Sequence, residues 1–465
     1  MFSNDQEELT RRSFRKTMFP DGWAISIFIV VAVVVPLCLG LTQMSHNPKF
    51  SVRDETAHFA YAHGILSQGL PKLGQHFDQF EMNEIACQGV YLPSWTFPPC
   101  GATTYLNSQF PGGGYITEAI QPPGYYAVVA IIGTSINWAF NIGILHALRI
   151  GSLLWLTAGL ILLWASGRLV GISPIKLGAG ILILAAAPTT VYFSAIVSND
   201  ASSIFAGSFI AFVCLLAFLK PGKWVPYILA LAGFLVVMLK PLDFIPVLVF
   251  SGLFAVSLSK DVWQNPDGRP QRIQSVVKRW LPTGGILLCS SLLGILFWSV
   301  LQKHIELVSI QSLCGVVNGG GPYYPSQLFI DPLSLWQPLT AFQSFNQAYF
   351  PHSVAAYLEA GLNVIIAFGL VAGGISLVFV KEKLWAHWMG FFSLIALYVG
   401  GLSLALNDWS ICRSSIGSDG RYGLSCAPLL VLAFLGASRG KWVTLCLWVV
   451  GIASVTADLS LMLVA

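Results

Sequence analysis

The segment Asp54-Glu55-Thr56-Ala57-His58 places three ionisable side chains within five residues of a chain in which only 10% of residues are charged. On a helix Asp54 and Glu55 diverge by about 100°, whereas Asp54 and His58, at i and i+4, share a face. Such a carboxylate could act as a general base for a hydroxyl group, while the imidazole could donate to a phosphate or a sugar. The alternative is that the acids only stabilise the start of a surface helix over 54–67.

Further ionisable residues stand at the ends of apolar runs. Asp200 follows an uncharged run and has no basic neighbour in the sequence, and ionisable groups at membrane depth tend to be functional. Its alternative role is to cap the next helix. Lys240, just before Pro241, could pair with Asp200 or Asp243, or bind a phosphate as a point charge.

Arg421 lies in the segment Ser418-Asp419-Gly420-Arg421-Tyr422, ahead of another apolar run. Its guanidinium group is suited to bidentate phosphate contact. Snorkelling to lipid head groups is the alternative.

The composition indicates an all-α polytopic membrane protein. Hydrophobic residues make up 55% of the chain, and a soluble protein typically has about a quarter of its residues charged. The net charge of +4 is small and lies mainly in short connectors. We therefore expect a membrane partner and no nucleic acid.

The basic connectors predict the topology, because Lys and Arg favour cytoplasmic loops. The basic residues ahead of the first apolar run, about 23–44, predict a cytoplasmic N-terminus and an uncleaved anchor. One consistent arrangement has about eleven spans and an external C-terminus. The ten later spans are expected at about 150–167, 177–197, 201–219, 223–240, 242–259, 281–302, 353–380, 384–405, 423–437 and 441–463.

The same arrangement predicts one transmembrane domain over 1–465, with two long external loops at 45–120 and 303–352. The run 121–145 must then begin and end outside, as a re-entrant or surface-lying hairpin. The alternative is an ordinary span, which Arg149 favours, because the predicted topology leaves that cation outside.

Four cysteines are expected on the external face: Cys87, Cys100, Cys314 and Cys412. They allow one or two disulfides in an oxidising compartment, and the sequence leaves their pairing open. The absence of an Asn-x-Ser/Thr sequon favours a bacterial cell (inner) membrane.

An ordered series of short motifs resembles the GT-C superfamily of polyprenyl-phosphate-sugar-dependent glycosyltransferases. The series is the Asp54-Glu55 pair after the first span, Gln121-Pro122-Pro123-Gly124-Tyr125-Tyr126 at the end of the first external loop, Asp200, and Gly420-Arg421-Tyr422. The likeness is nearest to bacterial membrane proteins of that superfamily, most of which have no known function.

The resemblance implies an inverting sugar transfer from a polyprenyl-phosphate donor to a glycan, lipid or protein acceptor on the external face. It implies a catalytic role for Asp54 with Glu55. The substrate-binding candidates are His58, Asp200, Lys240, Arg421 and Tyr422. Some branches place a divalent metal between their acids and others need none, and this sequence leaves the cofactor open.

Two rival classes remain at the level of sequence. A transporter or lipid flippase could line its pathway with the same charges, although the chain shows no internal repeat and its charges gather at one face. A noncatalytic scaffold in an envelope-building complex is the third class.

Overall fold

The computed structural model describes residues 22–91, 96–219, 222–263, 270–314, 327–336, 384–413 and 419–464, with the single residues 339, 361 and 375. Within these residues every regular element is a helix, and β pairing is limited to isolated bridges. The expected span at 353–380 and most of the expected loop at 303–352 lie outside the described residues.

Seven helices in the described part of the chain are long and apolar enough to cross a membrane. They are Gly22–His46, Ile144–Leu169, Asn199–Leu219, Pro282–Ile305, Trp385–Cys412, Gly420–Ala437 and Lys441–Ser460. A bent helix pair would make an eighth span. The prediction of an integral, all-helical membrane protein is therefore confirmed in its general form.

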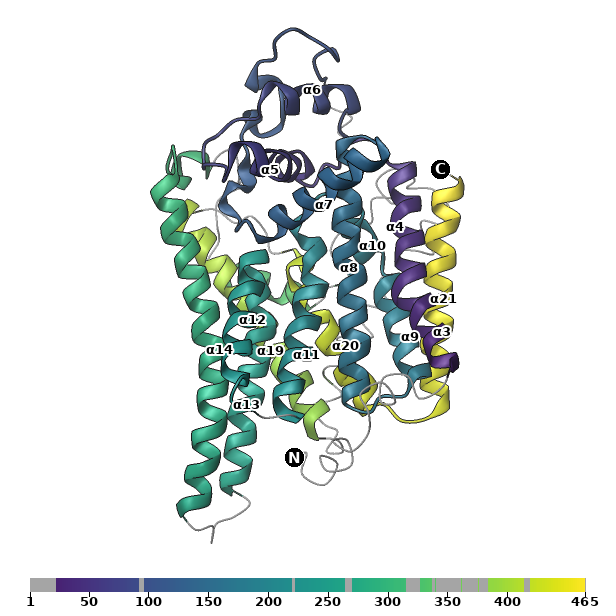
Figure 1. Cartoon of the computed structure of the whole chain (residues 1–465), viewed down its shortest axis with the longest axis vertical. Coiled ribbons are helices and arrows are strands. Elements are labelled where there is room, and N and C mark those ends of the chain that lie inside the picture. Colours follow the sequence, from purple (N-terminus) through teal and green to yellow (C-terminus); the bar gives the residue numbers. More distant parts are fainter. Residues whose placement is uncertain are drawn as a thin grey trace.

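Figure 1 shows the long helices side by side, with their ends at two opposite faces. The principal ones are α3 (Gly22–Ile29), continued through a short π-helical turn by α4 (Val35–His46), then α8 (Ile144–Leu169), α11 (Ser203–Leu219), α13 (Ile245–Trp263), α14 (Pro270–Ile305), α19 (Leu384–Cys412), α20 (Ala427–Ala437) and α21 (Lys441–Val464). Large hydrophobic side chains such as Trp442, Val449 and Leu293 stay exposed on this bundle, as contact with lipid would require.

The expected span at 177–197 is broken into two helices. α9 (Pro174–Ala185) and α10 (Pro188–Ser194) meet at an angle of 64°. Pro188 has no backbone N–H and forces the preceding Ala187 into an extended conformation, so the helix cannot continue. This pair is a broken span or a re-entrant element, in a place where the sequence predicted a straight crossing.

One helix, α7 (Gly124–Phe140), fills most of the run 121–145, which the sequence left open between a hairpin and an ordinary span. With only 17 residues it falls short of the roughly 20 that a perpendicular crossing needs. It packs against α8, and the chain turns between them at Asn141, whose φ is 51°. Trp138 and Phe140 are exposed near its end, which suits a helix at the membrane surface.

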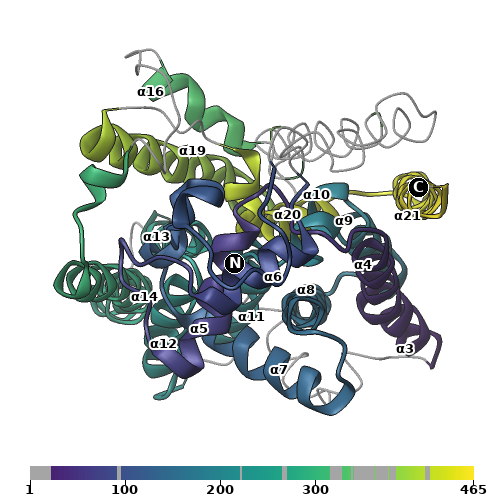
Figure 2. The same ribbon diagram turned by 90° about the horizontal axis from the view of Figure 1, so that it is seen from above.

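The segment 47–120 forms a cap over one face of the bundle. Its elements are α5 (Glu55–Gln68), α6 (Gln79–Gln88) and short 3-10 turns, the last of which is η4 (Thr117–Ile120). Seen from above, α5 and α6 lie across the ends of the bundle helices (Figure 2). A disulfide joins Cys87 to Cys100 within the cap, and a second joins Cys314 to Cys412. Both bonds were among the pairings that the sequence left open.

Candidate functional site

A buried charge cluster forms where three helix ends meet beneath the cap. The Lys240 ammonium group donates a hydrogen bond to Asp200 Oδ1, and Arg421 Nη1 lies 3.5 Å from Asp200 Oδ2. All three side chains are at least nine-tenths buried. The structure thus brings together three candidates that are separated by 221 positions in the sequence, between Asp200 and Arg421.

Local backbone geometry at helix ends and turns positions each of these side chains in the cluster. Ser198, in an extended conformation, caps the turn η5 (Asn199–Ser202) by accepting from the Asp200 N–H. Lys240 ends α12 (Val225–Leu239) in an extended conformation, as expected for a residue that precedes proline. Asp419 caps the turn η9 (Gly420–Cys426) by accepting from the Arg421 N–H.

Aromatic rings surround the two cations. The Arg421 guanidinium lies 5.0 Å from the ring centre of Phe193 and 5.1 Å from that of Tyr422, and Lys240 Nζ lies 5.0 Å from the Tyr422 ring. Arg421 Nη2 also donates to the Tyr422 hydroxyl over 3.3 Å. Tyr422 therefore belongs to the cluster, and it orients both cations at once.

Asp54 stands at the N-cap of α5 with φ 57°, in the left-handed region that only a few non-glycine residues adopt. Its carboxylate makes no capping hydrogen bond to α5, so Asp54 does not cap the helix in that way. The side chain is exposed to solvent. Even so, the dense protein around it raises the pKa of Asp54, while Arg421 and Arg53 act in the opposite direction. Asp54 is thus a solvent-accessible carboxylate within the electrostatic reach of the cluster.

Glu55, unlike Asp54, is buried, and its carboxylate contacts other protein groups. It forms a two-point ion pair with Arg149, at 2.7 Å from Nε and 2.8 Å from Nη2. It also accepts from the backbone N–H groups of Ser51 and Val197. Arg149, which the topology rule could not explain, is the buried partner of Glu55 and donates to two carbonyl oxygens of the cap as well. This geometry favours a structural role for Glu55.

His58 is buried, and its ring contacts differ from the predicted pair with Asp54. Nδ1 lies 2.7 Å from the Tyr126 hydroxyl, and Nε2 lies 3.9 Å from a Glu118 oxygen. Burial lowers the pKa of His58 to about 3, so the ring is neutral near pH 7.

Sequence reasoning did not select Glu118, Arg53 or Asp419, which complete the charged surroundings. Burial and then Arg421 lower the pKa of Arg53, whereas Asp419 and Asp54 raise it. Arg421 Nε lies 3.6 Å from Asp419 Oδ2. A usable signal was present, since Arg53 directly precedes Asp54, and Glu118 lies just before the Gln121–Tyr126 motif.

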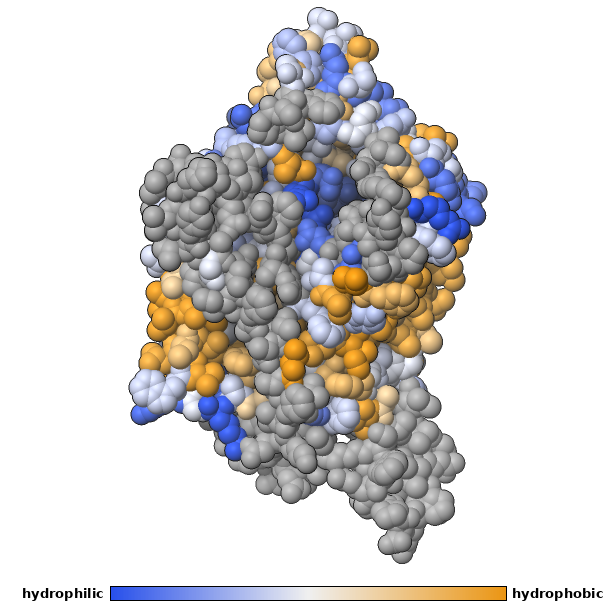
Figure 3. Space-filling model, turned by 180° about the vertical axis from the view of Figure 1, so that it is seen from behind, coloured by the Kyte–Doolittle hydropathy of each residue, from blue (hydrophilic) through white to orange (hydrophobic). Residues whose placement is uncertain are grey.

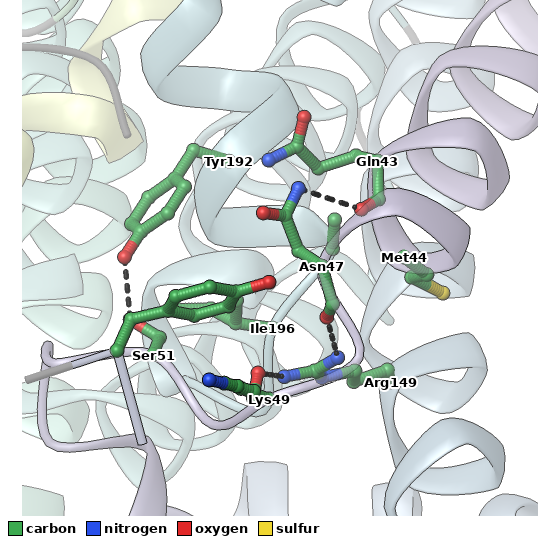
Figure 4. A pocket seen from close by; sticks show the side chains of 10 residues that line it. Gln43, Met44, Asn47, Lys49, Ser51, Arg149, Tyr192 and Ile196 are labelled. Carbon is green, nitrogen blue, oxygen red and sulfur yellow. Dashed lines mark hydrogen bonds between the residues drawn. The ribbon is translucent and has the colours of Figure 1, made fainter. Parts of the chain in front are cut away.

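A separate pocket lies beside the Glu55–Arg149 pair, between the end of α4, the segment 47–51 and α10 (Figure 4). Gln43, Asn47 and Lys49 line one side and Tyr192 the other, and the cavity volume is about 10 Å³, roughly the space that one water molecule needs. Ser51 and Tyr192 share a hydrogen bond at its edge. This bond ties α10 to the segment that leads into Asp54.

Ligand atoms suited to a metal ion gather elsewhere among the described residues, at His63, Asp78 and Glu81. There Asp78 and Glu81 form the reciprocal capping box of α6, which accounts for their positions. Helix capping therefore explains this cluster without a divalent metal.

The arrangement offers two chemical functions side by side. Lys240 and Arg421 present positive charge to an anion in surroundings shielded from water, where such charge acts strongly. Asp54 presents an accessible carboxylate that could accept a proton. Figure 3 shows hydrophilic residues gathered in a hollow in the upper half of the molecule, above a band of hydrophobic residues.

Comparison with known proteins gives no match: no protein-family model, curated protein or solved structure is similar to this chain.

Proposed function

We propose that the protein is a membrane glycosyltransferase that moves a sugar from a polyprenyl-phosphate donor to an acceptor on the external face of a bacterial inner membrane. The observation that carries this proposal is the gathering of Asp200, Lys240 and Arg421 beneath the cap, in which Asp54 stands at the start of α5. The sequence pattern alone singles out the same four residues. The resemblance to the GT-C superfamily supplies the reaction class.

In the proposed reaction, an acceptor hydroxyl oxygen forms a bond to the anomeric carbon as the bond from that carbon to the lipid phosphate oxygen breaks. The hydroxyl proton passes to Asp54, and the electron pair of the broken bond stays on the lipid phosphate. Lys240 and Arg421 stabilise the charge that develops there. Asp200 and Tyr422 both contact the two cations and hold them in place.

In this proposal Glu55 has a structural role, because it fixes the position of Asp54. Through Arg149 it fixes the start of α5 onto α8, and so fixes Asp54 relative to the bundle. His58 supports the wall of the site through Tyr126 and Glu118.

The test is donor cleavage by purified protein in lipid nanodiscs, with labelled polyprenyl-phosphate sugars and either water or an envelope glycan fraction as acceptor. Asp54→Asn should lower the rate by about 10²- to 10⁴-fold, the usual contribution of general acid-base catalysis. Glu84→Gln, on α6 of the same cap, is the matched control and should keep the wild-type rate.

Equal transfer by the wild type and Asp54→Asn would rule out the role of Asp54. If the protein moves a polar substrate across the membrane of proteoliposomes but transfers no sugar, it is a transporter and the proposed enzymatic function is wrong.

A further inference from the structure

The motif Gln121-Pro122-Pro123-Gly124-Tyr125-Tyr126 joins the cap to the bundle. The last turn of the cap, η4, ends at Ile120, and α7 begins at Gly124. Because a proline disfavours the helical conformation in the residue before it, Gln121 is extended, with φ −82° and ψ 148°. The prolines thus separate the two helical elements and fix the backbone from which the other side chains of the motif extend.

Tyr125 takes part in a chain of buried hydrogen bonds that ends just before Asp200. Its hydroxyl oxygen accepts from the Ser198 N–H over 2.9 Å, and the hydroxyl lies 2.5 Å from Ser152 Oγ. The Ser152 hydroxyl donates its one proton to the Leu148 carbonyl oxygen of α8, so Tyr125 donates to Ser152 and accepts from Ser198. The side chains of Tyr125, Ser152 and Ser198 are fully buried, so water cannot replace these bonds.

Ser198 extends this chain to Asp200. Its Oγ accepts from the Asp200 N–H and donates to Asp200 Oδ2, each over 3.3 Å. The next residue, Asn199, donates from its side-chain amide to Gln121 Oε1 over 3.2 Å. Tyr125 and Gln121 therefore hold the two consecutive residues that precede Asp200.

Gly124 brings the motif against the backbone that leads to Lys240. A Cβ atom at this position would lie 2.5 Å from the Met238 carbonyl oxygen, closer than real Cβ atoms approach. Glycine is therefore needed for α7 to begin this close to the end of α12, two residues before Lys240. The motif thus contacts both chain segments whose side chains meet in the Lys240–Asp200 ion pair.

We propose that the Gln121–Tyr126 motif is the positioning element of the charge cluster. Tyr125 and Gln121 fix the place of Asp200, and Gly124 fixes the place of Lys240. They are positioning residues, because they reach the cluster through the backbone and through Ser198. The catalytic consequence rests on the proposed function, whereas the positioning of the ion pair does not.

A thermodynamic cycle without substrate tests the positioning of Asp200. Denaturant unfolding of the full-length protein in a mild detergent is measured for Tyr125→Phe, Asp200→Asn and the double variant. If the Tyr125 hydroxyl holds Asp200 in its ion pairs, the unfolding constant of the double variant should differ by about 3-fold or more from the product of the single effects. Tyr105→Phe is the matched control, since its buried hydroxyl likewise accepts a backbone N–H, that of Ala102 in the cap. Its cycle with Asp200→Asn should be additive.

An additive cycle for Tyr125→Phe, or equal coupling in the control cycle, overturns the inference. Gln121→Met, which removes the acceptor of the Asn199 amide, takes the place of Tyr125→Phe if that variant does not fold. Its cycle with Asp200→Asn should show the same departure from additivity.

Sugar transfer in nanodiscs measures the catalytic consequence. Tyr125→Phe releases the segment before Asp200, and Gly124→Ala pushes on the backbone before Lys240. Each should lower kcat by about 10- to 10²-fold with a smaller change in the donor KM, because the charge on the leaving phosphate is greatest in the transition state.

Two controls separate position from stability in this assay. Tyr105→Phe should keep the wild-type kcat, and so should Gly167→Ala, whose added Cβ would press on Leu177 where α8 ends and α9 begins. Equal losses of kcat in the variants and in their controls overturn the inference. If the wild type transfers no sugar at all, the proposed function fails, while the thermodynamic cycle still decides whether Tyr125 positions Asp200.

Discussion

At the scale of single residues, the cluster depends on charges that neutralise one another away from water. Lys240 and Arg421 are both held by Asp200, and Arg421 has a second acid in Asp419. A buried ion pair adds little net stability over an apolar replacement, but a single charge left without its partner is costly. Asp200 is therefore the residue on which the cluster depends.

Asp200→Asn should destabilise the protein by about 3–5 kcal/mol, because it removes the carboxylate that the buried Lys240 binds directly. Denaturant unfolding in a mild detergent measures the change. The double variant Asp200→Asn/Lys240→Met should be closer to the wild type than Asp200→Asn alone, since Arg421 keeps Asp419. If the two substitutions destabilise additively, the ion pair does not exist as described.

The lowered pKa of His58 predicts that the folded protein loses stability in acid. Its pKa is lowered to about 3 in the folded protein from an ordinary value of 6.5, so the unfolded chain binds a proton first. Stability from the neutral ring is fully present above pH 6.5 and is lost as the pH falls towards 3. Thermal unfolding temperature between pH 7 and 5 should fall more steeply for the wild type than for His58→Gln. Replacement of the exposed His304 by Gln should leave the wild-type slope, and equal slopes for all three proteins would contradict the prediction.

At the scale of elements, an ion pair fixes the start of the cap to the bundle. Glu55, in the first turn of α5, binds Arg149 of α8, and Arg149 also donates to the carbonyl oxygens of Asn47 and Lys49. Glu55 further accepts from Val197 N–H in the stretch between α10 and η5. One carboxylate thus connects α5, α8 and the segment that leads to Asp200.

The structural and chemical roles of the two adjacent acids can be separated. Arg149→Met and Glu55→Gln should each cost about 3–5 kcal/mol in unfolding free energy, and each should speed proteolysis within 47–54. Asp54→Asn should lower the rate of transfer by about 10²- to 10⁴-fold but change stability by less than about 1 kcal/mol, because its carboxylate makes no capping hydrogen bond. Loss of transfer in Glu55→Gln with unchanged stability would return Glu55 to a direct catalytic role.

The contrast between Arg149 and the apolar runs shows how far the sequence could predict the fold. Hydrophobic length located the seven long apolar helices of the described residues, because a bilayer demands long apolar runs whatever their partners are. It could not show that α9 and α10 bend, which depends on Pro188, or that Arg149 meets Glu55 across 94 positions. The candidate site was found where charge is unusual for its surroundings. Glu118 was missed because an acid in a polar loop is ordinary until folding buries it.

At the scale of the whole molecule, the two faces of the bundle differ in chemistry. The cap, with α5 and α6, lies at the upper end in Figure 1, and it contains the disulfide Cys87–Cys100. At the opposite end, α8 is followed by α9 and α20 by α21. The last turn of α8 carries Arg168 and the first turn of α9 carries Lys176, while Arg439 and Lys441 lie just before and at the start of α21. Because disulfides persist in oxidising compartments and basic loops favour the cytoplasm, both signals give the same orientation.

Site-directed labelling tests this orientation. Ser67→Cys, exposed on α5, should react with a membrane-impermeant maleimide in intact spheroplasts, whereas Lys223→Cys, exposed before α12 at the other end, should react only after permeabilisation. Cys87 and Cys100 provide an internal control, because they should be labelled from outside only after reduction of their disulfide. Labelling of Lys223→Cys in intact spheroplasts would show that the protein has the opposite orientation in the membrane. It would also place the charge cluster on the cytoplasmic side, where a lipid-linked sugar exposed to the outer leaflet could not reach Asp54.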